Sequence, residues 1–185
     1  MPNHSTLLFC LSLAGLVAGC GRVAPQAERV ENGAANAAMT PAAAALERAA
    51  IDAGVIADSA HMSPVGLYRH RHEAGRDSLC ILPGEDGAMR FGLEAMFGEN
   101  IECHGHGTVR RSGDRLVMNF ARSACLIVAR YEGDRIMLPG ALDVGCERLC
   151  SERGTLEGVT FPRVSASASV AADARSVKGS PLCSL

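Results

Sequence analysis

The 185-residue sequence has no tryptophan, only two tyrosines and five phenylalanines. An aromatic-lined ligand pocket, or a platform on which nucleic-acid bases stack, therefore has few side chains from which to be built. Basic clusters are also missing: Lys178 is the one lysine, the longest basic run is Arg110-Arg111, and the net charge is −2. These features argue against nucleic-acid binding and against a polybasic membrane-binding patch.

Sequence patterns typical of common enzymes are absent as well. The chain has no Gly-x-Ser-x-Gly, no phosphate-binding glycine loop, no His-Glu-x-x-His and no Cys-x-x-Cys. The adjacent carboxylates Glu85 and Asp86 precede Gly87, a pattern typical of a solvated turn. The sequence therefore predicts a protein that is not an enzyme and needs no cofactor.

Long hydrophobic runs are absent except at the N-terminus, where residues 7–19 form an apolar run of thirteen. As a helix this run would span about 20 Å, which is short of the roughly 30 Å hydrocarbon core of a bilayer. It is therefore typical of the hydrophobic part of a signal peptide rather than of a transmembrane helix.

The run ends in Leu16-Val17-Ala18-Gly19-Cys20, which resembles the lipobox of bacterial lipoproteins. The resemblance implies that residues 1–19 are a cleaved signal peptide and that Cys20 carries fatty acyl chains, palmitate among them. The protein would then be anchored to the bilayer on the periplasmic side of the cell envelope, and Gly21 favours the outer membrane. An ordinary secretory signal with an incidental Cys20 is the alternative, and it also predicts export.

Residues 20–39 lack periodicity and predict a flexible tether. Residues 40–56 predict a short helix, because Thr40-Pro41 fits an N-cap and first helical position and Gly54 fits a helix stop. We expect this helix to pack on the following domain, since twelve isolated residues are marginally stable.

Residues 57–185 predict a disulfide-stapled β domain, because apolar residues alternate with polar ones and short polar turns separate the runs. Connections this short require antiparallel neighbours, so we expect a mainly β meander that closes into a small barrel rather than folding as a sandwich. A short helix is expected within 142–152, and a loop or frayed helix over 165–180. The eight expected strands are 65–71, 78–82, 88–97, 101–111, 115–121, 125–131, 135–138 and 155–164.

Six cysteines follow the presumed lipidation site, and an even number in an exported domain predicts three disulfides. Of the fifteen pairings, the turn near Gly113 favours Cys103–Cys125. Cys146 and Cys150 suit a mutual bridge poorly, so we expect them to reach Cys80 and Cys183. A zinc–thiolate cluster is the alternative, disfavoured because no Cys-x₂-Cys pair is present.

Two His-x-His pairs, His70 with His72 and His104 with His106, each place two imidazoles on one face of a strand. If the pairs came from facing strands, they could ligate copper, zinc or nickel. Against this, the second pair fits a solvated outer face, and Arg69 and Arg71 would repel a cation near the first.

An anchored, disulfide-stapled β-barrel is similar in architecture to lysozyme-inhibitor lipoproteins and small lipocalin-like lipoproteins. We therefore expect a lipid-anchored binding or inhibitory module of the cell envelope. Its partners would be the bilayer, through Cys20, and an envelope protein or small ligand. The alternatives are an envelope metal-binding protein that uses the paired histidines, and a structural accessory of the envelope.

Overall fold

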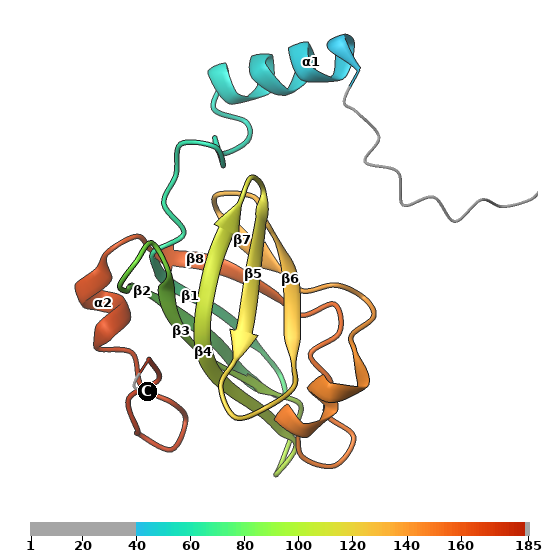
Figure 1. The fold of residues 1–185 in the computed structure, drawn as a ribbon, viewed down its shortest axis with the longest axis vertical. Coiled ribbons are helices and arrows are strands. Elements are labelled where there is room, and N and C mark those ends of the chain that lie inside the picture. Colours follow the sequence, from blue (N-terminus) through green and yellow to red (C-terminus); the bar gives the residue numbers. More distant parts are fainter. Residues whose placement is uncertain (1–39, 184–185) are drawn as a thin grey trace, which may run out of the picture. The chain divides into compact units, whose positions relative to one another are not determined.

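A closed, eight-stranded antiparallel barrel forms the body of the protein in the computed structural model, which describes residues 40–183 (Figure 1). The fold class expected from the sequence is therefore confirmed. The expected signal peptide, Cys20 and the expected tether lie outside the described residues. The strands are β1 (Gly66–His72), β2 (Gly75–Pro83), β3 (Met89–Met96), β4 (Glu102–Ser112), β5 (Arg115–Phe120), β6 (Leu126–Tyr131), β7 (Arg135–Met137) and β8 (Thr160–Ser165).

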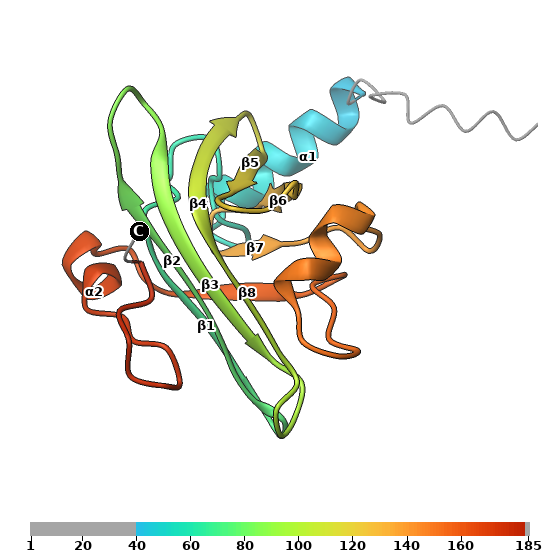
Figure 2. The ribbon, with the colours of Figure 1, turned by 60° about the horizontal axis from the view of Figure 1, so that its bottom comes forward.

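Each strand pairs with the next in the sequence, and β8 closes the barrel by pairing with β1 (Figure 2). Glycines with positive φ support the tight connections, among them Gly113 (φ 60°) and Gly133 (φ 86°). Two boundaries differ from expectation. The last strand begins at Thr160 because a turn at Gly158 precedes it, and β2 begins already at Gly75, which pairs with His72. The β1–β2 hairpin is therefore longer than the apolar pattern indicates.

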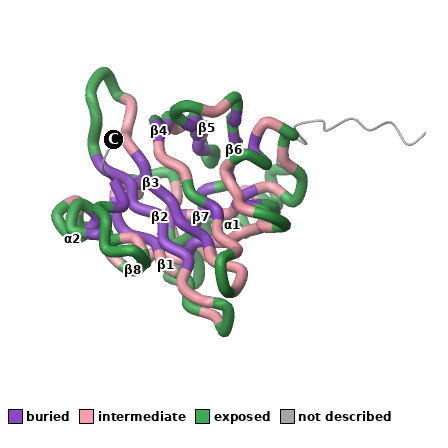
Figure 3. The backbone as a smooth tube through the Cα atoms, turned by 90° about the horizontal axis from the view of Figure 1, so that it is seen from below, coloured by how far each residue is buried: buried purple, intermediate pink, exposed green. Residues whose placement is uncertain are grey.

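The barrel interior is filled with side chains. Its largest members are Tyr68, Phe91, Phe120, Tyr131 and Phe161, each at most 2% exposed. Phe91 and Phe120 meet edge to face, with ring centroids 4.9 Å apart. Figure 3 shows burial concentrated along the strands, with exposure at the turns. Sites for ligands among the described residues therefore lie at the barrel ends and on its outer surface.

Polar side chains attach the segment that precedes β1 to the barrel. The Tyr68 hydroxyl donates to the Pro64 carbonyl, and Arg163 donates to the Ser63 carbonyl and to the hydroxyls of Tyr68 and Tyr131. Burial raises the pKa of both tyrosines, so they remain neutral donors. These bonds hold the segment before β1 against the barrel, although the buried Nε of Arg163 has no hydrogen-bond partner.

A second apolar cluster lies outside the barrel, where α2 (Ala168–Ala172) and the chain after it cover β1 and β2. At Gly92 on β3, an added Cβ would lie 1.8 Å from the Leu182 carbonyl oxygen, so only glycine permits this close approach. The cluster comprises Leu67, Cys80, Leu82, Ala171, Ala174, Leu182 and Cys183.

All six domain cysteines form disulfides, in the pairs Cys80–Cys183, Cys103–Cys150 and Cys125–Cys146. Three disulfides are therefore confirmed, but the expected Cys103–Cys125 pair is wrong, as is the expectation that Cys146 and Cys150 bond to Cys80 and Cys183. The reason is the turn after Phe120. Cys125 directly precedes β6, which pairs with β5 and not with β4, and the Cys125 carbonyl accepts from the Phe120 N–H.

The short helix expected within 142–152 is the 3₁₀ helix η1 (Val144–Leu149), and it carries Cys146. Its cap, Cys150, reaches β4, whereas Cys146 reaches Cys125 at the start of β6. Cys146 and Cys150 thus bond to different partners, as their spacing indicates.

The N-terminal helix α1 (Pro41–Asp52) begins as expected, because the Thr40 side chain accepts from the Ala43 backbone N–H. It stops before Gly54 (φ 68°), with backbone bonds from Gly54 to Ile51 and from Val55 to Ala50 that are typical of a Schellman motif. None of its residues is buried, and the packing of this helix on the following domain stays a prediction. Within the described part of the chain, helices are too short or too polar to cross a membrane.

Candidate metal site at one end of the barrel

The β1–β2 hairpin brings two histidines and a carboxylate together. His70 and His72 follow Tyr68 at intervals of two, so all three share the inward face of β1. Asp77 lies opposite His70 in the β1–β2 register and precedes the inward-facing Leu79. Residues directly opposite in an antiparallel pair share a face, so the carboxylate joins the two imidazoles.

Both imidazoles direct one ring nitrogen toward the same carboxylate. His72 Nε2 lies 3.1 Å from Asp77 Oδ1, and His70 Nδ1 lies 3.9 Å from Asp77 Oδ2. Donor atoms around one tetrahedral zinc ion, with bonds of about 2.0–2.1 Å, lie about 3.3 Å apart. The three donor atoms all lie within 4.8 Å of one another, and the His70 side chain, which is 52% exposed, is the least confined of the three.

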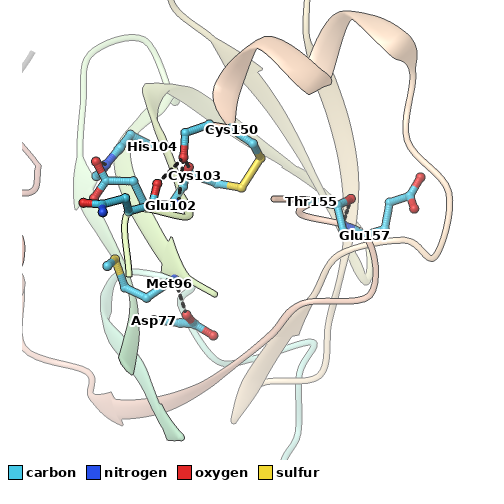
Figure 4. The surroundings of a disulfide bond; sticks show 10 residues. Asp77, Met96, Glu102, Cys103, His104, Cys150, Thr155 and Glu157 are labelled. Atoms are coloured by element: carbon cyan, nitrogen blue, oxygen red, sulfur yellow. Dashed lines mark hydrogen bonds and ion pairs between the residues drawn. A yellow bond between two sulfur atoms is a disulfide. The ribbon is translucent and has the colours of Figure 1, made fainter. Parts of the chain in front are cut away.

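Asp77 is buried and positioned by the backbone. Its side chain is 6% exposed, and its Oδ1 accepts a hydrogen bond from the Met96 N–H at 2.9 Å (Figure 4). A buried carboxylate is costly unless a cation or a full set of hydrogen bonds compensates its charge. The groups at hand to compensate it are His70 and His72, as protonated partners or as fellow ligands of a cation.

The neighbouring arginines lie on the opposite face of the sheet. Strand alternation directs Arg69 and Arg71 outward, where they meet Arg76 of β2. Partial burial and these two like charges lower the pKa of Arg69. The expected repulsion of a cation at His70 and His72 is therefore weakened, because the sheet separates the two sets of side chains.

The site opens into a pocket of about 510 Å³ at the barrel end. His70, His72 and Asp77 form one wall, and Gly158, Val159 and Thr160 lie in the pocket lining with them. The pocket is shallow and largely open to solvent.

The second histidine pair does not join this site. His104 and His106 lie on β4, which is separated from β1 by β2 and β3 in the barrel order, and they face outward. Figure 4 shows His104 and Glu102 on one side of β4, while Cys103 turns to the other side toward Cys150. The four histidines therefore do not form one metal centre, and the outer-face interpretation of His104 and His106 fits their position.

His104 instead lies between two carboxylates under the C-terminal segment. Its Nε2 lies 3.0 Å from Glu102 Oε1, and its Nδ1 lies 3.8 Å from Glu94 Oε1. Lys178 also donates to Glu102, and Val177 N–H donates to the fully buried Glu94. The lysine and then His104 lower the pKa of Glu102.

The two clusters differ in which nitrogen faces which oxygen. Around His104, one ring points its two nitrogens at two different carboxylates. The Lys178 ammonium contacts Glu102 Oε1, the same oxygen that His104 Nε2 faces. That arrangement suits ionic bridging. Around Asp77, two separate rings converge on a single carboxylate, and imidazole and carboxylate donors suit divalent transition metals.

No protein-family model, curated protein or solved structure matches this chain.

Sequence reasoning found His70 and His72 but missed Asp77. A signal was present: if the hairpin turns between Glu73 and Ala74, residue 70 faces residue 77. The apolar pattern started β2 only at residue 78, which left Asp77 in the turn.

Proposed function

We propose that the protein is a lipid-anchored component of the bacterial cell envelope that binds a divalent transition-metal ion at the end of its barrel. The observation that carries the proposal is the convergence of His70 and His72 on the buried carboxylate of Asp77. Imidazole and carboxylate ligands suit Zn²⁺, Ni²⁺ and Cu²⁺, and Cu²⁺ should bind most tightly of the three.

The filled barrel interior supports a function at the ends or on the outer surface. Residues that would line an internal cavity are instead buried core, such as Phe91, Phe120 and Phe161. A binding or inhibitory role would therefore use the ends or the outer face, and the metal site lies at one of these ends.

Calorimetric titration with Cu²⁺ and Zn²⁺ tests the metal site. We expect one ion per protein with a dissociation constant below about 10 μM, which corresponds to roughly −7 kcal/mol. Asp77→Asn keeps the size of the side chain but removes its charge, and His70→Ala removes one ligand, so each should weaken binding at least tenfold. His106→Ala is the matched control and should bind as the parent protein does. Binding weaker than 10 μM, or unchanged in both site variants, would contradict the proposal.

Membrane attachment is tested separately through Cys20. Two or three acyl chains anchor a protein stably, whereas none leaves it free. Cells that express the full chain should hold it in the membrane fraction, and metabolic labelling with palmitate should mark it. Cys20→Ser should abolish the label and release the protein, whereas the signal-peptide variant Cys10→Ser should not. A labelled Cys20→Ser protein would rule out the anchor.

A further inference from the structure

The ligand set at the barrel end comes from a single hairpin and contains three donor side chains. Within residues 40–183, His70, His72 and Asp77 are the only donors in this cluster. Structural zinc sites use four protein ligands, whereas zinc sites that react with an outside ligand use three and leave a position to solvent. The donor count therefore places this site in the second class.

The other residues that line the pocket offer no imidazole, thiol or carboxylate. They are Ala74, Met96, Phe97, Gly158, Val159 and Thr160, so small or apolar groups and one hydroxyl surround the ligands. Exposure also follows a gradient, from the His70 side chain at 52% through His72 at 27% to Asp77 at 6%. An ion held by the three side chains would thus have all its protein ligands on the hairpin side, and its remaining coordination position would face the pocket.

Charge selects the kind of ligand that could enter. A divalent ion with one carboxylate and two neutral imidazoles retains one net positive charge, and the pocket lining holds no carboxylate besides Asp77. The arginines of β1 lie on the other face of the sheet. A small anion with an oxygen donor neutralises the remaining charge within a pocket of about 510 Å³.

We propose that the bound metal keeps an exchangeable coordination position that faces this pocket, and that the position binds a small carboxylate-bearing ligand. This inference rests on the proposed metal-binding function and adds a ligand class to it. The site would then be a place where metal and small anion bind together, not a closed structural centre.

The experiment uses the full chain in detergent, loaded with Co²⁺, and records its visible absorption during titration with acetate and then azide. We expect each anion to change the cobalt bands saturably, because it enters the coordination sphere in place of water. Co²⁺ in protein-free buffer corrects for complexes formed in solution. The variant His106→Ala, which alters an outer-face histidine, should respond as the parent does.

The outcomes separate the two proposals. If Co²⁺ and Cu²⁺ do not bind, the metal-binding function itself is wrong. If the metal binds but acetate does not change the cobalt bands saturably, this inference alone is overturned, whether or not proton relaxation on the Cu²⁺ form shows an exchanging water. The Asp77→Asn variant, measured with enough Co²⁺ to saturate its metal site, should still show the anion-induced change in the cobalt bands, because removing the carboxylate charge should strengthen anion binding. Loss of that change in Asp77→Asn would also overturn this inference.

Discussion

Asp77 places a buried carboxylate at the end of the barrel that holds His70 and His72. Its carboxylate receives a single backbone hydrogen bond, from Met96, and faces two imidazoles. Buried carboxylates are stable when they are paired or coordinate metals. The two imidazoles are the side chains that face this carboxylate, so any ion bound there would be shared between them and Asp77.

Five of the six aromatic side chains of the domain are used for packing. Tyr68, Tyr131, Phe91, Phe120 and Phe161 are buried in the barrel. The sixth, Phe97, is half-buried and lines the pocket beside His70 and His72.

Gly105 gives a prediction at the residue scale. A Cβ added there would lie 2.3 Å from the Phe120 ring, so Gly105→Ala must displace a core aromatic. Overpacking of this kind costs about 1–3 kcal/mol. At Gly140 a Cβ meets nothing within 4 Å, so Gly140→Ala should leave the free energy of unfolding nearly unchanged. Urea unfolding of both variants measures the difference, and equal midpoints would show that the Phe120 ring has room to move.

At the scale of elements, the C-terminal segment acts as a cover on the outside of β1 to β4. A disulfide joins it to β2, Arg76 donates to the Arg175 carbonyl, and Val177 donates to Glu94. This cover explains why a carboxylate and small polar groups on the outer face of the barrel are buried, among them Glu94 and Ser78.

The ionic part of this attachment should depend on pH. Lys178 and His104 hold the pKa of Glu102 below its usual value of about 4.5. Because the folded pKa is lowered, the stabilisation is fully present above pH 4.5 and is lost as pH falls through the lowered pKa. Amide hydrogen exchange of residues 176–180, corrected for intrinsic rates, should therefore accelerate in that acid range.

Glu102→Gln should remove this acid-dependent part of the protection and leave the segment equally loose at neutral and acid pH. Glu99→Gln, in the exposed turn before β4, is the matched control and should keep the parent's pH profile. An unchanged profile in Glu102→Gln would show that the Lys178 contact does not hold the segment.

At the scale of the whole molecule, the three disulfides close loops of very different length. Cys80–Cys183 joins residues 103 apart, whereas Cys125–Cys146 joins residues 21 apart. In the chain-entropy description, stabilisation grows with the logarithm of loop length, from about 3 kcal/mol for 15 residues to about 4.7 kcal/mol for 100.

The double variant Cys80→Ala/Cys183→Ala should therefore lose about 2–5 kcal/mol of unfolding free energy while the barrel remains folded, because its main core lies elsewhere. The loss should exceed that of Cys125→Ala/Cys146→Ala, as measured by chemical denaturation followed by circular dichroism. The reverse order would mean that packing around Cys125 and Cys146 outweighs loop closure.

The sequence by itself determined the strands, their antiparallel order and the barrel class, because alternation and turn residues act locally and short connections leave neighbours no other arrangement. It also indicated that Cys146 and Cys150 do not pair with each other. The actual disulfide partners, the burial of Asp77 and the separation of His70 from His104 were decided only by the tertiary structure. Each of these depends on which strands are neighbours after the barrel closes and on which face of the barrel η1 and the C-terminal segment cover. A local sequence pattern encodes neither the strand neighbours nor the covered face.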